Sequence, residues 1–235
     1  MVNFARKYVR IVNYSFSRTR THMTVKIETL AVGPLEVNCY VVGCGEHNLC
    51  AVIDPGDSSK RILAIIKENG WKLTHIINTH AHFDHVGANG KVKEATGARI
   101  ILHKDDIPVL THPNTIDMAN YMGLDISPDP DEFMRDGDII EICPCIKFEV
   151  LHTPGHSPGG VCLVLGDALF SGDTLFRLSI GRSDLPGGSM DALMLSIKTK
   201  LFPLPDKVTV YPGHGEKTDM GFEKANNPFL TGAFH

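Results

Sequence analysis

The chain has 235 residues, of which 43% are hydrophobic and 21% are charged, and its formal net charge is −4 at pH 7. This composition is typical of a globular protein with a sizeable buried core in one domain or two small ones. It excludes the strongly basic surface that attracts nucleic acid or an anionic membrane, and no run approaches the roughly 18 consecutive apolar residues of a transmembrane helix. We therefore expect no nucleic-acid partner and no membrane partner, whereas the composition leaves the oligomeric state open.

The N-terminal segment differs in composition from the rest of the chain. Residues 1–23 are rich in arginine and serine, and no acidic residue precedes Glu28. This bias is typical of an organellar transit peptide, but Met23 directly precedes the first strand-like run and is an alternative start. We expect residues 1–23 to be a basic extension outside the fold and residues 24–235 to form one domain. The expected location is cytoplasmic, with organellar targeting by the extension left open.

The hydrophobic pattern of the remaining chain predicts two αβ halves. Strands are expected at residues 25–30, 39–42, 49–53, 76–78, 99–102, 146–151, 160–165, 168–171 and 207–211, and helices at 58–69, 92–95 and 190–200. Residues 104–135 are polar, contain four prolines, and are expected to form scattered helical turns or a flexible flap near the site. The pattern indicates an α/β protein in which two sheets pack together with helices outside.

Three histidines and an aspartate lie within six residues, directly after the strand expected at 76–78: His80, His82, Asp84 and His85. The ends of strands in α/β sheets are where functional sites are built. His80 and His82 are two residues apart, so they project to the same side of an extended segment. Asp84 follows them if the extension continues, whereas His85 points elsewhere. One loop can therefore serve two metal positions, because imidazole and carboxylate both bind zinc, iron or manganese.

Three later turns each place one further metal-binding side chain beyond an expected strand. His156 lies in a turn rich in glycine and proline, Asp173 lies in a Ser-Gly-Asp-Thr turn, and His214 follows Pro-Gly. Each turn alone is a weak signal, but together they bring two imidazoles and a carboxylate to the ends of three strands.

The six cysteines have neither the density nor the spacing of a disulfide framework. We expect reduced, mostly buried thiols, as in a cytosolic protein.

Taken in chain order, these motifs resemble the metallo-β-lactamase superfamily and, within it, the short, single-domain glyoxalase II-like hydrolases. Further segments that match this branch are Asn-Cys-Tyr at 38–40, Val-Ile-Asp-Pro-Gly at 52–56, Phe-Ser-Gly-Asp-Thr-Leu-Phe at 170–176 and Gly-Arg at 181–182. The resemblance implies a four-layer αββα sandwich and a catalytic domain at 24–235. The long glyoxalase II enzymes add a C-terminal helical domain that helps to bind glutathione, and this chain ends twenty-one residues after His214.

The resemblance also implies a ligand set for two divalent metal ions, which are zinc or, alternatively, iron or manganese. One ion is held by His80, His82 and His156. The other is held by Asp84, His85 and His214, and Asp173 bridges the two. Asp84 and Asp173 are then the catalytic carboxylates. A carboxylate can bridge two cations where an imidazole cannot, which supports this assignment.

The implied reaction is hydrolysis by a metal-bridging hydroxide, on a thioester such as S-lactoylglutathione. Two alternatives stay open. One is a hydrolase of the same fold that acts on another ester, a lactone or a phosphodiester. The other is an oxidoreductase that resembles the persulfide dioxygenases, in which a single iron is held by His80, His156 and Asp173.

The expected charge of the site predicts a small anionic substrate. Two divalent ions bring four positive charges, which two aspartates and a hydroxide only partly cancel. Arg182 adds to the positive charge if its loop faces the site. Asp54 either forms a turn or orients a ligand imidazole, as metal-bound histidines usually require.

Overall fold

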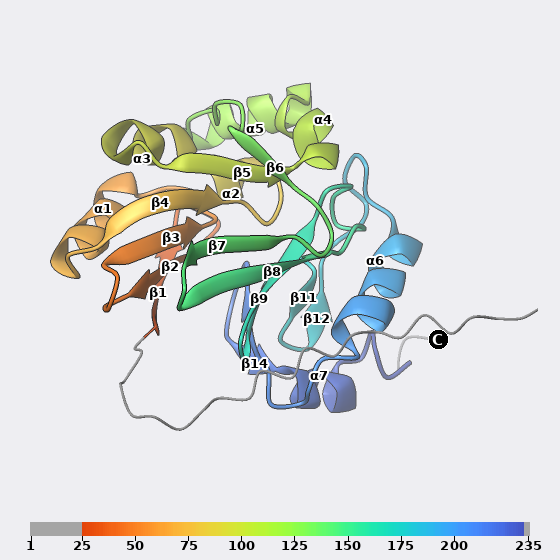
Figure 1. Cartoon of the computed structure of the whole chain (residues 1–235). Coiled ribbons are helices and arrows are strands. Elements are labelled where there is room, and N and C mark those ends of the chain that lie inside the picture. Colours follow the sequence, from red (N-terminus) through yellow and green to blue (C-terminus); the bar gives the residue numbers. More distant parts are fainter. Residues whose placement is uncertain (1–24, 233–235) are drawn as a thin grey trace, which may run out of the picture.

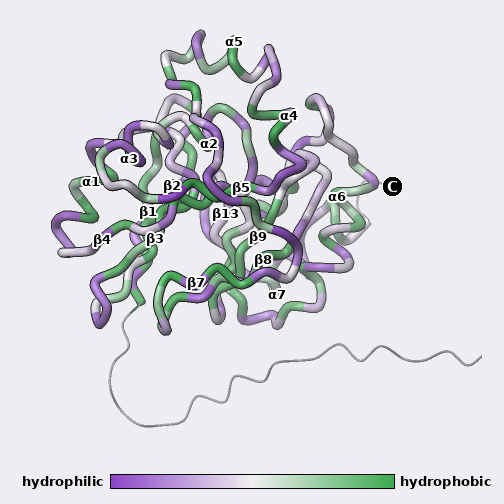
Figure 2. Tube along the Cα trace, turned by 45° about the horizontal axis from the view of Figure 1, so that its top comes forward, coloured by the Kyte–Doolittle hydropathy of each residue, from purple (hydrophilic) through white to green (hydrophobic). Residues whose placement is uncertain are grey.

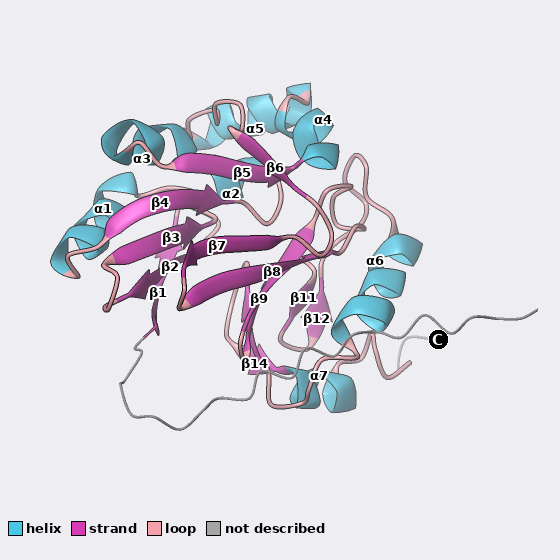
Figure 3. Ribbon diagram, viewed as in Figure 1, coloured by secondary structure: helices cyan, strands magenta, loops and turns pink. Residues whose placement is uncertain are grey.

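The computed structural model describes residues 25–232, so the expected N-terminal extension at residues 1–23 lies outside the described residues. Two six-stranded sheets pack face to face, and helices lie on their outer sides (Figures 1 and 3). No helix within residues 25–232 is long and apolar enough to cross a membrane.

The first sheet has its six strands in chain order. They are β1 (Val25–Val32), β2 (Val37–Cys44), β3 (Leu49–Ile53), β4 (Lys72–Ile77), β5 (Arg99–His103) and β6 (Glu132–Met134). The first three strands pair antiparallel, and β3 to β6 pair parallel. Parallel neighbours require crossover connections, and helices supply them.

The second sheet has the order β14-β13-β10-β9-β8-β7. Its strands are β7 (Ile139–Cys143), β8 (Ile146–His152), β9 (Val161–Leu165), β10 (Ala168–Gly172), β13 (Thr209–Pro212) and β14 (Thr218–Asp219). All pairs are antiparallel except β10 with β13. A small hairpin joins β11 (Leu175–Phe176) to β12 (Ser179–Ile180).

The helices are short and belong to two groups that cover different sheets. Over the first sheet and its carboxyl edge lie α1 (Ser59–Glu68), α2 (Phe83–Val86), α3 (Asn89–Thr96), a 3₁₀ turn (Lys104–Asp106), α4 (Ile107–Leu110) and α5 (Pro113–Met122). Over the second sheet lie α6 (Met190–Ser196), which continues as a π turn (Ile197–Leu201), and α7 (Met220–Asn226).

Three apolar clusters connect the layers. Between the sheets, Ile53 and Ile77 pack with Phe148 and Phe170. A second cluster joins α1 and α3 to the first sheet, and a third joins α6 to the second sheet. The apolar colouring in Figure 2 is accordingly concentrated in the central strands. All eight residues of β2 are buried because this strand is covered on both faces. The expected αββα sandwich is confirmed.

The segment at 104–135, which was expected to form scattered helical turns or a flexible flap, is ordered into helices and a strand. It contains α4 and α5, and it ends in β6, which extends the first sheet. Val109 and Leu110 are buried against Ala81 and Val86, so this segment packs directly on the histidine-rich loop. The short strands β6, β7 and β14 and helix α7 were not expected from the sequence, because segments of two to seven residues carry too little periodicity.

Ser58 directly precedes α1. Ser58 adopts a left-handed conformation with φ 58°, and its side chain makes no capping hydrogen bond.

Candidate metal centre

The seven candidate ligands converge because their loops follow the carboxyl ends of neighbouring strands. The histidine-rich loop begins after β4, and His156 follows β8. Asp173 and His214 follow the parallel pair β10 and β13. Since parallel strands end at the same edge of a sheet, both loops open at one end of the sandwich.

The first group of ligands is His80, His82 and His156. One ring nitrogen from each lies within 4.8 Å of the others. The closest pair is Nδ1 of His82 and Nε2 of His156, at 2.9 Å. His80 is 1% exposed. His82 is the last extended residue before α2 begins, as the alternation of His80 and His82 requires.

The second group of ligands is Asp84, His85 and His214, whose ligand atoms also lie within 4.8 Å of one another. Nε2 of His214 lies 3.4 Å from Oδ2 of Asp84 and 3.4 Å from Nε2 of His85. The extended run does not continue to Asp84, because α2 starts at Phe83. The helical turn places this carboxylate beside His214 instead of in line with His80 and His82.

Asp173 lies between the two groups. Its Oδ2 is 3.4 Å from Nε2 of His156 and 3.7 Å from Nε2 of His214, and its Oδ1 is 3.4 Å from Nε2 of His85. A Cβ atom at Gly213 would collide with this carboxylate, so the Pro-Gly-His turn needs glycine there. One carboxylate therefore reaches ligand atoms of both groups.

Two buried atoms at this centre show that the donor set fits a metal. Within residues 25–232, Nε2 of His80 and Oδ1 of Asp173 are the buried side-chain nitrogen and oxygen atoms without a hydrogen-bond partner. An unpaired buried polar atom costs free energy, and a cation placed among these nitrogen and oxygen donors would satisfy both atoms. The arrangement fits nitrogen- and oxygen-binding divalent ions.

Four of the five candidate ligand imidazoles, those of His80, His85, His156 and His214, are oriented by a contact at the other ring nitrogen. Nδ1 of His156 lies 2.7 Å from the carbonyl oxygen of Arg182, and Nδ1 of His214 lies 3.0 Å from that of Leu35. Nδ1 of His80 lies 3.0 Å from the hydroxyl of Thr79. Such contacts hold a histidine in the ring orientation and tautomer that a metal requires.

Asp54 makes the corresponding contact with His85. Its Oδ2 lies 3.1 Å from Nδ1 of His85 and accepts a hydrogen bond from the Thr79 hydroxyl at 2.6 Å. Its Oδ1 accepts from the Thr79 backbone N–H at 2.7 Å. Asp54 therefore touches a candidate ligand, and of its two open interpretations this geometry fits the orienting one.

The side chain of Arg182 is directed elsewhere. Its guanidinium donates two hydrogen bonds to Asp184, at 2.7 and 2.8 Å, and is 63% exposed. Its backbone carbonyl contacts His156, and its positive charge is one of the smaller causes that lower the pKa of His82.

Asp106 is a buried residue of this region that the sequence did not single out. Its Oδ2 accepts from the backbone N–H of Ala81 at 2.8 Å and from the hydroxyl of Ser157 at 2.9 Å. Its Oδ1 accepts from the N–H of Gly159 at 2.5 Å. One carboxylate thus ties the His80–His82 loop to the His156 loop. Nothing in the local Asp-Asp-Ile-Pro pattern distinguishes it from a helix-start acid.

Asn38 and Tyr40 fix the third loop. The Asn38 amide donates to the carbonyl oxygens of Pro212 and Gly215, and the Tyr40 hydroxyl donates to that of Pro212 at 2.6 Å. These contacts hold the turn that carries His214.

The pKa shifts differ between the two groups of candidate ligands. Burial and the neighbouring imidazoles hold the pKa of His80 well below its ordinary value and lower the pKa of His82 to about 3. Burial would also lower the pKa of His85, but three surrounding carboxylates, led by Asp173, raise it to about 10. Burial opposes ionisation of Asp84, yet the adjacent His85 lowers its pKa. His80 and His82 are therefore in the neutral form that could bind a metal, whereas His85 would have to release a proton first.

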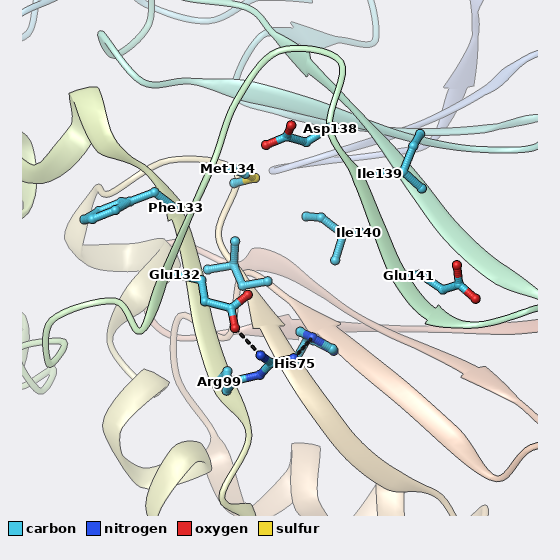
Figure 4. Close-up of a pocket in the computed structure, with 10 residues that line it drawn as sticks. His75, Arg99, Glu132, Phe133, Met134, Asp138, Ile139, Ile140 and Glu141 are labelled. Atoms are coloured by element: carbon cyan, nitrogen blue, oxygen red, sulfur yellow. Dashed lines mark hydrogen bonds and ion pairs between the residues drawn. The ribbon is translucent and has the colours of Figure 1, made fainter.

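A separate cavity of about 310 Å³ lies at the edge of the sandwich, between β6 and β7 (Figure 4). His75, Arg99, Glu132 and Phe133 are among its lining residues, and Arg99 contacts both His75 and Glu132. None of the seven candidate ligands lines it. The chemistry of the site is therefore at the strand ends rather than in this cavity.

Comparison with known proteins identifies a family. The model of the metallo-beta-lactamase superfamily matches residues 32–214. A hydroxyacylglutathione hydrolase, GloC of Haemophilus influenzae, is 35% identical over 210 residues, which are 88% of this chain and 98% of that protein.

Solved structures agree with this match. The crystal structure of TTHA1623 in a di-iron-bound form is 41% identical, with a TM-score of 0.77 over 86% of this chain and 100% of that one. The crystal structure of ETHE1 from Myxococcus xanthus is 29% identical, with a TM-score of 0.76 over 88% of this chain and 85% of that one.

Proposed function

The chain belongs to the metallo-beta-lactamase superfamily, and from this premise we propose that it is a binuclear metal-dependent hydrolase of small anionic thioesters of the acylglutathione class. The observation that carries the proposal is the position of Asp173, whose two oxygens reach ligand atoms of two separate groups. A site for one metal ion would need no second group.

The residues would divide between two ions. His80, His82 and His156 would hold one ion. Asp84, His85 and His214 would hold the other, and Asp173 would be shared. A pair of divalent ions lowers the pKa of a shared water to near 7 and so supplies hydroxide at neutral pH. The imidazole contacts described above keep the ring nitrogens aimed at the ions.

The charges of these residues favour an anionic substrate. Asp84 and Asp173 bring two negative charges against the four positive charges of two divalent ions. The centre keeps a net positive charge even with one hydroxide, and it therefore attracts a substrate that carries carboxylates.

The leaving group favours a thioester. All seven polar side chains of the centre serve as ligands in this assignment, which leaves none of them to protonate a departing amine or alkoxide. A thiol has an ordinary pKa near 8.5, so it departs as the thiolate without a proton donor. The similarity to a hydroxyacylglutathione hydrolase over nearly all of that protein's length supports the same class.

A mono-iron dioxygenase of the persulfide class is a second candidate, because the chain is also similar to ETHE1. His80, His156 and Asp173 would be sufficient for it. Asp84, His85 and His214 would then have no role in metal binding, although their ligand atoms lie within 4.8 Å of one another.

The deciding experiment combines metal counting with two assays on the purified full chain. Thiol release is followed with S-lactoylglutathione, and oxygen uptake is followed with glutathione persulfide. We expect two metal equivalents bound by the seven ligands, thioester cleavage and no oxygen uptake. Oxygen uptake without thioester cleavage, with one iron, would replace the proposal by the dioxygenase. Cleavage of another ester or a phosphodiester in preference to the thioester would retain the centre and change the substrate.

A further inference from the structure

A second set of metal-binding side chains lies on two hairpin turns. The cysteine–histidine cluster consists of Cys44, His47, Cys143 and Cys145. Cys44 is the last residue of β2, and His47 lies in the turn that leads to β3, in a Cys-x-x-His pattern. Cys143 is the last residue of β7, and Cys145 lies beyond Pro144 in the turn that leads to β8, in a Cys-x-Cys pattern. The two turns belong to different sheets, so only the packing of the sandwich brings them together.

The donor atoms of the cluster are spaced as around one ion. All four lie within 4.8 Å of one another. Nδ1 of His47 is 3.3 Å from Sγ of Cys44 and 3.5 Å from Sγ of Cys145. Zinc bonds of roughly 2.3 Å to sulfur and 2.0 Å to nitrogen, arranged as a tetrahedron, separate those donors by about 3.5 Å.

The turns also present backbone amides to the sulfurs. The N–H groups of Glu46 and His47, two and three residues after Cys44, are directed at its sulfur. Cys143 receives the same two contacts from the residues two and three positions after it. Amides aimed at a sulfur stabilise the thiolate, which is the form that binds a metal.

We propose that the cysteine–histidine cluster is a structural zinc site, separate from the centre at the strand ends. Three thiolates and one imidazole complete a closed tetrahedron with no open position for a water or a substrate, which is the pattern of structural rather than catalytic zinc. Cys44 and Cys143 are buried, whereas His47 is exposed and Cys145 is half-buried, so an ion can enter from one side.

The location indicates what the ion would do. Cys145 and His156 lie beyond opposite ends of β8, whose seven residues span roughly 20 Å. Likewise, β2 runs from Val37, which bridges to His214, to Cys44. In Figure 1 both turns lie at the same end of the sandwich. A zinc ion there would join the first sheet to the second at the end remote from the catalytic centre and would hold the inter-sheet core closed.

Cobalt(II) provides a specific test, because a sulfur-to-cobalt charge-transfer band requires a thiolate ligand. None of the seven ligands of the strand-end centre contains sulfur, so the band reports only the cysteine–histidine cluster. We expect the reduced full chain to show the band when it is loaded with cobalt(II). The band should disappear in Cys44→Ala/Cys145→Ala and persist in His80→Ala. Cys50→Ala, which removes a buried cysteine of β3 outside the cluster, should also retain it.

Zinc counting provides a second readout, and it uses substitutions at an exposed and a half-buried position so that the variant can still fold. The exposed His47 and the half-buried Cys145 are changed together, as His47→Ala/Cys145→Ser. Relative to the Cys50→Ala control, this variant should lose about one zinc equivalent and should unfold at lower temperature in the presence of zinc. Equal zinc content in the two proteins would overturn the proposal. So would a reduced wild type without the charge-transfer band, or a disulfide among Cys44, Cys143 and Cys145 in protein isolated under non-reducing conditions.

Discussion

Oδ2 of Asp54 lies 3.1 Å from Nδ1 of His85, and both side chains are buried. This contact links the end of β3 to the loop after β4, and it leaves Nε2 of His85 facing the carboxylates of Asp84 and Asp173. It determines which nitrogen of His85 is available to a metal, and it makes Asp54 a positioning residue for the second group of ligands.

Replacement of Asp54 by asparagine should therefore weaken metal binding without removing a ligand. The amide keeps the shape of the carboxylate but loses its charge, so His85 becomes a poorer and less well oriented donor. We expect the affinity for the more weakly held ion to fall by about 10–100-fold, as for other partners of ligand histidines. Chelator competition measures this change. Asp117→Asn, the same substitution on the exposed face of α5, is the control, and equal affinities in the two variants would contradict the role of Asp54.

The two groups of ligands predict separate losses of metal. His82→Ala and His85→Ala should each lose about one metal equivalent, because the two side chains belong to different groups. Elemental analysis counts the ions, and far-ultraviolet circular dichroism checks that the fold is kept. Unchanged metal content in both variants would show that this division is wrong.

Asp173→Asn should affect both metal positions at once. An asparagine has only one oxygen, so it cannot replace contacts made by both carboxylate oxygens. Titration of the metal-free variant should show weakened binding in both steps, in contrast to His82→Ala, where one step should resemble that of the wild type. A variant with one unperturbed step would remove Asp173 from the shared position.

Asp106→Ala should destabilise the protein although Asp106 contacts none of the seven ligand side chains. The change removes a buried carboxylate and leaves three donors unpaired, in the loops that carry His82 and His156. We expect a loss of about 2–4 kcal/mol in the free energy of unfolding and a lower metal affinity. Urea unfolding measures the first quantity. Asp105→Ala, at the exposed neighbouring position, should change the free energy of unfolding much less.

The raised pKa of His85 predicts a pH dependence of the metal-free protein. The pKa in the folded chain is about 10, against 6.5 for an ordinary histidine. Protonated His85 therefore stabilises the fold fully below about pH 6.5, and this contribution is lost as the pH rises toward 10. Denaturant unfolding of the metal-free chain across this range should show the loss, and His85→Gln should flatten it.

The proton on His85 competes with a metal ion for the same imidazole. Binding should tighten as the pH rises, because the ion displaces the proton from His85. Calorimetric titrations in buffers of different ionisation enthalpy count the released protons. A proton count that does not change between wild type and His85→Gln would contradict this assignment.

The candidate ligands could be predicted from the sequence because each signal is local. Alternation places His80 and His82 on one side, and the short glycine- and proline-containing turns around His156 and His214 follow recognisable strands. Because these strands end at the same edge of the sandwich, the turns that follow them come together, and no other sequence signal is needed to predict this. The position of Asp84 was less predictable, because a helix of four residues is too short for its hydrophobic periodicity to show where the extended segment ends.

The sequence by itself indicated an α/β protein with two packed sheets and helices outside, and it pointed to the seven candidate donors, since periodicity, turn residues and ligand spacing act over a few neighbouring positions; the four-layer αββα order was implied by the resemblance to the superfamily. Only the tertiary structure decided which side chains from distant segments meet. It placed Asp106 between two loops and brought the turn of Cys44 and His47 against the turn of Cys143 and Cys145. Those contacts join residues separated by 25 to about 100 positions, and they depend on how two sheets pack, which no local pattern encodes.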